Sequence, residues 1–271
     1  WVPVKDYTTM YEEKTATLLG VTTQTTVYSK LRQRSGDSYS IVTPGDESGI
    51  REPDVLSQYD TSSSYYSILG SSTKDMADKM VTEYKATYES IKKYKGFYIG
   101  RYELTGSVAS PTVQKGQTVL DASTAGNWYN LKKACTNIVS TIYAQSTMIY
   151  GNQWDEVMSW LKTTEFASDP SKVDSDSSSW GNYINSTGEA ATGSRTRRPS
   201  GYNEAWKANN IYDLAGNCWE WTQEANNTYY RVNRGGYYSY SGSNYPASDR
   251  SNYDPVGSGS SYSSRPALYI K

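Results

Sequence analysis

Histidine is absent from this chain of 271 residues. The absence excludes a Ser-His-Asp triad, a Cys-His pair, a histidine-ligated zinc site and any acid–base step by imidazole. Cysteine is scarce as well, because Cys135 and Cys218 are the two present. Two cysteines so far apart suit neither a disulfide scaffold nor a metal site, and the usual place of such thiols is the core.

Phenylalanine occurs only twice, whereas tyrosine occurs 27 times. Much of the aromatic surface therefore carries a hydroxyl that needs a hydrogen-bond partner or water. The 27 lysines and arginines nearly balance the 28 aspartates and glutamates, so no basic stripe is available for a phosphate backbone and no nucleic acid is expected as partner. No apolar run approaches the roughly twenty residues of a membrane span, so none is expected.

The N-terminal third divides into three parts. Residues 1–4 are typical of a short strand, and residues 8–72 are rich in Thr, Ser, Gly and Asp without sustained periodicity, which predicts an irregular surface insertion. Helical spacing of apolar residues, with Ser72 and Asp75 as a capping box, predicts an amphipathic helix over residues 73–94.

The middle of the chain predicts a strand and two helices. Gly96 is expected to end the first helix, and residues 96–105 alternate as in a half-buried strand. Apolar residues from Trp128 to Ile142 mark one face of a second helix. A third helix follows around residues 154–161, with Asn152 as its cap and two acidic residues, Asp155 and Glu156, in its first turn.

Two further stretches lie before the C-terminal segment. Residues 167–210 have the Ser, Gly, Asn and Arg content of long loops. Residues 211–222 read IYDLAGNCWEWT and are dense in apolar and aromatic side chains. They predict a core turn that leads into a strand.

The C-terminal segment, residues 231–271, has the most unusual composition. From Tyr237 to Ser264 it contains no Lys, Glu, Gln, Met or Trp, and it consists mostly of Ser, Tyr, Gly, Asn and Asp. A low-complexity linker is one interpretation. The number of tyrosines and the closing apolar PALYI run, typical of a buried strand, favour instead a displayed binding surface.

Several of these stretches together resemble the formylglycine-generating enzyme family. The run of residues 212–222, followed by RVNRGG at 231–236 and a closing Arg265, is the most specific part. Earlier pieces match in order at residues 1–4, 97–105 and 128–135. The resemblance implies a single α+β domain over residues 1–271 with an elaborated C-type lectin fold: a small antiparallel sheet, two or three helices and long loops. Residues 10–95 would be an insertion that includes the helix.

The same fold and the same Gly-Asn-x-Trp-Glu-Trp neighbourhood are also used by the variable proteins of diversity-generating retroelements. In the enzyme, the chemistry depends on a pair of copper-binding cysteines a few residues past the Gly-Gly element. The corresponding residues here, 237–245, contain no cysteine. The oxidation therefore lacks its nucleophile and soft metal ligand, and no enzymatic activity is expected.

Codon arithmetic favours the variable proteins. Mutation of the adenines in an Asn codon can yield Tyr, Ser, Asp, Gly, Val or Asn, but never Lys, Glu, Gln, Met or Trp. Those five residue types are the ones missing between Tyr237 and Ser264. The alternative is a chance loss of five residue types in a short polar loop.

On this interpretation the C-terminal segment divides into anchors and a contact face. Turn formers and anchors would hold the backbone so that little ordering entropy is spent on binding; they are Gly235, Gly236, Gly242, Pro246, Ala247, Arg250, Pro255, Arg265 and Pro266. The expected ligand-binding residues are Tyr237, Tyr238, Ser239, Tyr240, Ser241, Ser243, Asn244, Tyr245, Asp249, Ser251, Asn252, Tyr253, Asp254, Val256, Ser258, Ser260, Ser261 and Tyr262.

No cofactor is required on this interpretation, but the family resemblance implies a possible structural calcium. Its side-chain ligands would be Asp213 and Glu220, with the backbone carbonyls of Gly216 and Cys218, since oxygen ligands suit a hard cation. The other interpretation is that Asp213 caps the turn and Glu220 pairs with a buried arginine. Candidate arginines for such carboxylates are Arg231, Arg234 and Arg250.

Three functions are therefore weighed. The first is a noncatalytic ligand-binding protein whose C-terminal segment is diversified by a retroelement, with a protein or glycan of a cell surface as ligand, carried by a phage virion or a bacterial surface. The second is a formylglycine-generating-type oxidase or relative without its catalytic cysteines. The third is a structural component of a virion or surface, in which the Tyr/Ser segment would pack against a neighbouring subunit.

Overall fold

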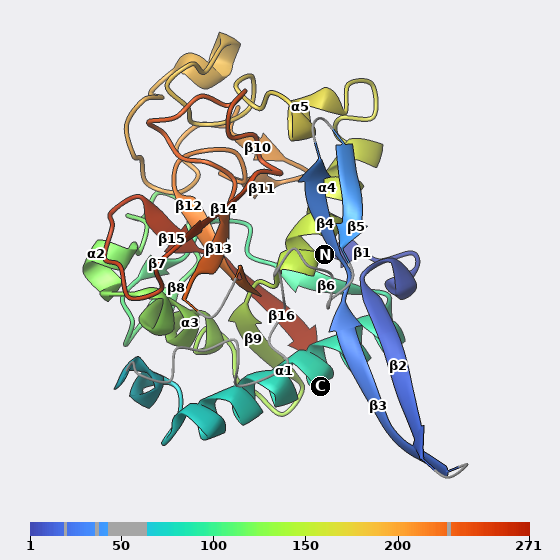
Figure 1. Ribbon diagram of the computed structural model, residues 1–271. Coiled ribbons are helices and arrows are strands. Elements are labelled where there is room, and N and C mark those ends of the chain that lie inside the picture. The colour runs from blue at the N-terminus through green and yellow to red at the C-terminus, as the bar shows by residue number, and fades with distance from the viewer. Residues whose placement is uncertain (19–20, 36–37, 43–63, 227–228) are drawn as a thin grey trace.

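A four-stranded antiparallel sheet joins the two ends of the chain. The computed structural model describes residues 1–18, 21–35, 38–42, 64–226 and 229–271 (Figure 1). The strand order is β1 (Val2–Pro3), β6 (Gly96–Ile99), β16 (Pro266–Ile270), β9 (Ala144–Met148). The PALYI run is thus an internal strand, and both the initial and the terminal strand predicted from sequence are confirmed. The predicted strand over residues 96–105 is shorter than expected, since β6 ends at Ile99.

Helix α1 (Thr73–Tyr94) lies against this sheet and matches the prediction. The Ser72 side chain accepts a hydrogen bond from the Asp75 backbone N–H, as expected of an N-cap. The prediction that Gly96 ends the helix is wrong by one residue, because Lys95 takes the left-handed conformation at φ 60°. Gly96 instead opens β6, where a Cβ would lie 2.3 Å from the Trp1 ring.

Helices α3 (Trp128–Thr136) and α4 (Gly151–Thr163) carry most of the remaining helical structure. The predicted apolar helical face from Trp128 to Ile142 is longer than α3, since the helix stops at Thr136 and Ile142 is 79 % exposed. Asn152 was also wrongly placed as the cap of α4: the N-cap is Tyr150, and Asn152 lies inside the first turn. Its amide donates to the Met10 carbonyl at 3.1 Å, so it fastens α4 to the N-terminal segment.

A second four-stranded sheet carries the C-terminal half, in the order β14 (Arg250–Tyr253), β13 (Arg231–Arg234), β12 (Trp219–Ala225), β15 (Tyr262–Ser264). The β12–β15 pair is parallel, whereas the other pairs are antiparallel. The fold is therefore α+β with small, mainly antiparallel sheets and long loops, as expected. The one small sheet expected from the sequence is replaced by two four-stranded sheets, and the described residues also form several two-stranded ones.

Shorter elements connect these parts. They are β7 (Thr105–Gly106), β8 (Pro111–Thr112), α2 (Ala122–Ala125), α5 (Ser171–Asp174), β10 (Lys207–Ala208) and β11 (Ile211–Tyr212), with 3-10 turns at η1 (Tyr7–Thr9), η3 (Ser64–Ile68) and η4 (Gly188–Ala191). Residues 167–210 consist mostly of loops, as predicted, and residues 211–222 form the predicted turn and strand. No helix in the described part of the chain is long and apolar enough to cross a membrane.

The prediction of an irregular segment over residues 8–72 is wrong for its first half. Two hairpins form there, β2 (Tyr11–Leu18) with β3 (Val21–Ser29) and β4 (Leu31–Ser35) with β5 (Ser38–Val42). Figure 1 shows the β2–β3 hairpin extending away from the rest of the chain. Strands β2 and β3 are rich in β-branched threonine, which suits a pleated surface even without an alternating apolar face. Residues 43–63 lie outside the described residues, so the prediction is not tested there.

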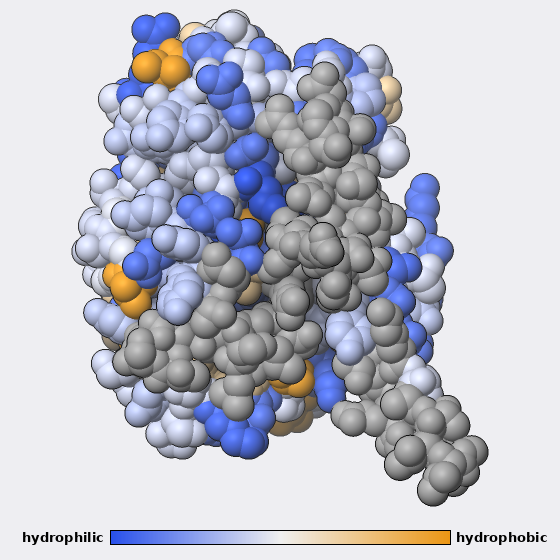
Figure 2. Space-filling model, in the orientation of Figure 1, coloured by the Kyte–Doolittle hydropathy of each residue, from blue (hydrophilic) through white to orange (hydrophobic). Residues whose placement is uncertain are grey.

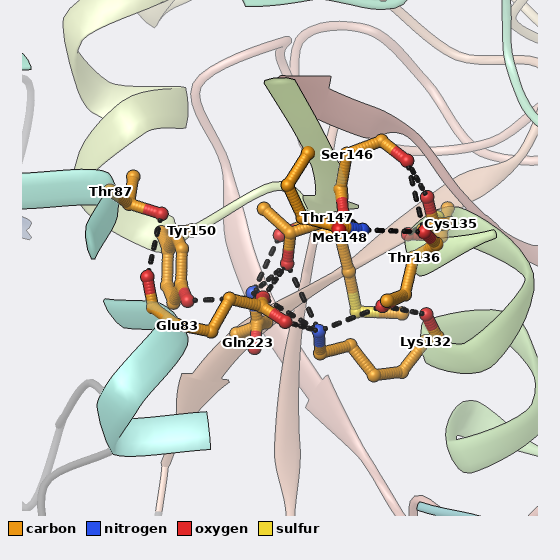
Figure 3. Close-up of polar contacts among 12 residues, drawn as sticks. Glu83, Thr87, Lys132, Cys135, Thr136, Ser146, Thr147, Met148, Tyr150 and Gln223 are labelled. Atoms are coloured by element: carbon orange, nitrogen blue, oxygen red, sulfur yellow. Dashed lines mark hydrogen bonds and ion pairs between the residues drawn. The ribbon is translucent and has the colours of Figure 1, made fainter. Parts of the chain in front are cut away.

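A buried polar network joins α1 to α3 and β9 (Figure 3). The Lys132 ammonium contacts both carboxylate oxygens of Glu83 at 2.7 and 2.8 Å and donates to the Thr147 hydroxyl at 3.0 Å. The Gln223 amide donates to Thr147 and to the Met148 carbonyl. The contacts engage the ammonium on several sides, so this ion pair holds α1 in place.

Candidate ligand-binding surface

Two adjacent glycines begin the Tyr/Ser segment by turning the chain out of β13. Gly235 and Gly236 have φ of 88° and 75°, a region that side chains rarely adopt. A Cβ on Gly236 would lie 2.6 Å from the Tyr245 carbonyl and 2.8 Å from the Tyr183 ring. Glycine is therefore required for the segment to fold back on itself here.

The residues expected to be anchors are buried. They contact the scaffold through backbone and ring atoms, as where the Ala247 N–H donates to Ser177 and the Ala247 carbonyl accepts from the Trp154 indole. The buried anchors are Gly235, Gly236, Gly242, Pro246, Ala247, Pro255, Arg265 and Pro266. The segment is thus held along its length and does not hang from its two ends.

Arg250, the remaining anchor, belongs to a buried ion-pair cluster below the segment. Its guanidinium lies 2.8 Å from Glu224 and 2.9 Å from Asp155, and Arg234 contacts Asp155 at 2.7 Å. Asp155 comes from α4 and Glu224 from β12, so the cluster connects the segment to both. Arg234 and Arg250 were expected as partners of Asp213 or Glu220, and this prediction is wrong, because they pair with Asp155 and Glu224 while Arg265 pairs with Glu220.

Seventeen of the eighteen expected ligand-binding residues are exposed or half-buried, and the exception is Asp249, which is 8 % exposed. Asp249 follows the buried Pro246–Ser248 stretch, and its N–H donates to the Pro246 carbonyl. It therefore belongs with the anchors. The exposed members are Ser239, Tyr240, Ser243, Asn244, Asn252, Tyr253, Asp254, Ser258 and Ser260.

The first of two aromatic clusters on this face forms around Tyr240. Its ring stacks on Tyr245 with centroids 4.6 Å apart and meets the Tyr237 ring edge-on at 4.5 Å. Tyr245 in turn contacts the buried Trp219 of β12 at 5.5 Å. A tyrosine held between other rings loses little entropy on binding, which suits it as a contact residue.

The second cluster is a stack of three rings. Tyr262 lies 5.1 Å from the buried Trp221, and Tyr253 lies 4.7 Å from Tyr262, with interplanar angles of 20° and 13°. Tyr253, the outer ring, is 41 % exposed. Burial raises the pKa of Tyr262 to about 12, so its hydroxyl stays protonated at neutral pH. Neither tryptophan was expected at the site, although both lie in the WEW run beside it.

The turn after β11 contains the residues expected to hold calcium. Asp213 has φ 59°, and one of its carboxylate oxygens accepts from the Ser200 hydroxyl at 2.8 Å and the Gly201 N–H at 2.7 Å. Its other oxygen has no partner among the described residues. Glu103 lies nearby and also has an oxygen without a partner, and burial together with the Asp213 and Glu220 charges raises its pKa well above the usual range.

Glu220 is occupied by an arginine that the sequence did not indicate as its partner. Both of its oxygens accept from Arg265, at 2.5 and 2.9 Å, and both residues are buried. Arg265 also donates to the carbonyls of Gly100 and Tyr212. A calcium ion that used Glu220 would compete with this guanidinium, whereas the free oxygen of Asp213 suits a hard cation. Calcium binding by Asp213, Gly216, Cys218 and Glu220 stays a prediction.

Replacement of Asp213 by asparagine should stabilise the protein at neutral pH by on the order of 1 kcal/mol. Burial raises the pKa of Asp213 to about 6, so the folded protein keeps this proton after the unfolded chain has lost it. The wild type therefore loses stability as pH rises from about 4 to about 6, and Asp213→Asn should not. The measurement is urea denaturation of both proteins at pH 4.5 and pH 7.5.

The calcium prediction is tested by the same pair of proteins. If calcium binds at the ionised Asp213, millimolar calcium should stabilise the wild type, and Asp213→Asn should abolish that gain. Denaturation in chelator provides the reference. If, in chelator, the free energies of unfolding of the two proteins differ by the same amount at pH 4.5 and at pH 7.5, the pKa of Asp213 is not raised.

The two cysteines are buried thiols. Cys135 packs in α3 beside Ser264, and burial raises the pKa of its thiol to about 12. Burial also raises the pKa of Cys218 well above its usual value. Both thiols are therefore protonated at neutral pH and neither is a nucleophile. The prediction that Cys135 serves packing is confirmed.

No protein-family model matches the chain, and no curated protein is similar to it. Among solved structures, it is similar to Treponema denticola variable protein 1, with a TM-score of 0.36 and 13 % sequence identity. The match covers 95 % of this chain and 99 % of that protein.

Proposed function

We propose that this protein is a noncatalytic ligand-binding protein with a C-type lectin fold, whose C-terminal face is diversified by a retroelement. The observation that carries the proposal is a division within residues 237–264. Most of its Tyr, Ser, Asn and Asp side chains are exposed or half-buried, with Ser248, Asp249, Ser263 and Ser264 as the exceptions, whereas the turn formers Gly242, Pro246 and Pro255 are buried in the scaffold. Variation confined to exposed positions changes the contact surface and leaves the backbone in place.

The chemistry of the face favours a protein of a cell surface as ligand. Its tyrosines offer large contact area with a hydroxyl at the edge, and its serines and asparagines offer adaptable hydrogen bonds. The rings of both clusters already stack on one another, so at least one face each of Tyr240, Tyr245, Tyr253 and Tyr262 is covered by a neighbouring ring. Edges and hydroxyls remain for contact, which suits a protein surface better than the flat face of a sugar. Display on a phage particle or a bacterial surface is part of the proposal.

The test is to sequence the coding DNA of residues 231–271 and to search the adjoining few kilobases. A near-copy that differs mainly at adenines, next to a reverse transcriptase gene, is the expected result. The positions that differ should coincide with the exposed residues of the face and spare the buried anchors. If no near-copy exists and the Tyr and Ser codons do not derive from AAC or AAT, diversification is refuted and the face is a fixed one.

The assembly state of the protein distinguishes the alternative function, a structural component of a virion or surface, from the proposed one. Such a component would bury Tyr240 and Tyr253, each 41 % exposed in this chain, against a neighbouring subunit. Light scattering over a range of concentrations measures whether copies associate, and tyrosine-to-serine changes on the face would abolish that association. A monomer that stays soluble with these rings exposed fits the ligand-binding proposal.

A further inference from the structure

We infer that a fixed arginine loop, residues 193–198, borders the Tyr/Ser face and selects ligands with an acidic protein segment. The inference rests on the proposed function and goes beyond it, since the loop lies outside the diversified segment. The loop reads GSRTRR, and its three arginines are Arg195, Arg197 and Arg198. It would supply a constant part of recognition beside a variable one.

The loop touches the face directly. The Arg197 guanidinium donates to the Ser260 carbonyl at 2.9 Å, and it forms an ion pair with the buried Asp121. On the other side, the Tyr238 N–H donates to the carbonyl of Asn217, whose side chain holds the loop. Arg197 therefore connects the arginine loop to the Tyr/Ser face, while its charge is balanced by Asp121.

Two buried asparagines fix the loop. The Asn182 side chain accepts from the Arg195 N–H at 3.1 Å and donates to the Thr196 carbonyl at 2.9 Å. The Asn217 side chain accepts from the Arg198 N–H at 3.0 Å, and the two amides bond to each other at 2.9 Å. Both asparagines are 0 % exposed, so the loop backbone is fastened to the core by buried hydrogen bonds.

Arg195 is held in a conformation that costs energy. Its φ is 70°, in the left-handed region that residues other than glycine and asparagine rarely adopt. An arginine there, although glycine would be less strained, indicates that the side chain is used. Arg195 is exposed, and its guanidinium makes no ion pair with any described residue.

Arg198 is the second available cation. Its guanidinium carbon lies 4.8 Å from the centre of the Tyr202 ring, and its Nε donates to the Gly193 carbonyl at 2.8 Å. Stacking and this hydrogen bond leave the two terminal nitrogens for a ligand carboxylate. Since planar guanidinium groups pair with carboxylates through two parallel hydrogen bonds, a pre-positioned arginine gives direction as well as charge.

The face itself lacks positive charge, and this decides what the loop adds. Of the ligand-binding residues, the charged ones are Asp249, which is buried, and Asp254. Arg250 lies below the face with its side chain 7 % exposed. The loop therefore places cationic groups at one border of a surface whose exposed charged residue is Asp254. Charge complementarity at a border sets the orientation and the association rate of a partner.

The probe is a fluorescently labelled peptide of ten glutamates, with ten glutamines as the uncharged reference. Binding is measured by anisotropy at low and at physiological salt. We expect the wild type to bind the glutamate peptide, and Arg195→Gln/Arg198→Gln to bind it about ten-fold more weakly, with a shallower salt dependence. The variant with both arginines changed to lysine should recover part of the affinity.

The matched control is Lys85→Gln/Lys133→Gln, which removes the same charge from exposed positions on α1 and α3. It should bind within about two-fold of the wild type. An equal loss in both double variants would show that net charge, and not the loop, attracts the peptide, and would overturn the inference. If the loop bound polysialic acid but not the glutamate peptide, that result would also overturn the inference. Thermal melting confirms that each variant folds.

The two proposals fail separately. A retroelement near-copy together with unchanged binding by Arg195→Gln/Arg198→Gln would leave the diversified face intact and refute the role of the loop. Loop-dependent binding, with no near-copy and with Tyr and Ser codons that do not derive from AAC or AAT, would support the acidic-ligand site and refute diversification.

Discussion

Changing Glu220 to glutamine should destabilise the fold by about 3 kcal/mol, the largest single effect expected on folding. Arg265 is 0 % exposed and loses its only close carboxylate partner among the described residues. A glutamine amide cannot replace the carboxylate, because its NH₂ group is a hydrogen-bond donor and would face the Arg265 guanidinium, which also donates. The nearby carboxylates of Asp213 and Glu103 compensate only part of the charge. Urea denaturation followed by circular dichroism measures the loss.

Glu204→Gln is the matched control. Glu204 also forms ion pairs, with Lys115 and Lys207, but at the surface. Water and salt screen such pairs, so the unfolding curve should hardly move. Similar curves for Glu220→Gln and the wild type would mean that the Arg265 guanidinium does not depend on Glu220. Because Arg265 also holds the end of the Tyr/Ser segment, we expect the destabilised protein to lose any ligand binding by that segment as it unfolds.

Truncation of Tyr240 or Tyr253 to alanine should weaken binding of a cell-surface ligand by about 2 kcal/mol or more, about thirty-fold in Kd. Both rings are 41 % exposed and rest on other aromatic rings, so each presents a rigid contact to a partner. A ligand is first selected with the wild-type protein from displayed surface proteins of candidate hosts. Surface plasmon resonance then gives Kd for each variant.

Tyr143→Ala and Ser243→Ala are the controls for this prediction. Tyr143 is 74 % exposed in the turn before β9, outside the face, so its loss should not change Kd. Ser243 is an exposed serine of the face, and rim positions contribute little. If Tyr143→Ala weakens binding as much as Tyr240→Ala does, the ligand does not bind at the Tyr/Ser face.

The sequence-based predictions that are wrong share one physical cause, which is that the local sequence carries no signal for the feature in question. The bounds of helix α1 could be predicted, although its C-cap was misplaced by one residue, because its N-cap and its apolar spacing are local signals. The sequence did not predict the β2–β3 hairpin, because its threonine-rich strands show no alternating apolar pattern. Asp249 was assigned to the face by its residue type, and only the burial of its neighbours places it below the surface.

The candidate site, too, could be predicted from the sequence only in part. Composition alone identified the Tyr/Ser segment and its anchors, since the types of residue that tolerate exposure, and the glycines that allow φ above zero, are visible in a sequence. Partners distant in the chain were not visible. Arg265 meets Glu220 across 45 residues, and Arg197 meets Ser260 across 63.

The sequence by itself therefore determined the composition of the Tyr/Ser segment and most of the local elements around it, because capping, periodicity and side-chain chemistry act over a few residues. The tertiary structure decided which charges meet and which rings stack. It also decided which loop stands beside the face, because those contacts depend on how β12, β13 and residues 182–198 are brought together.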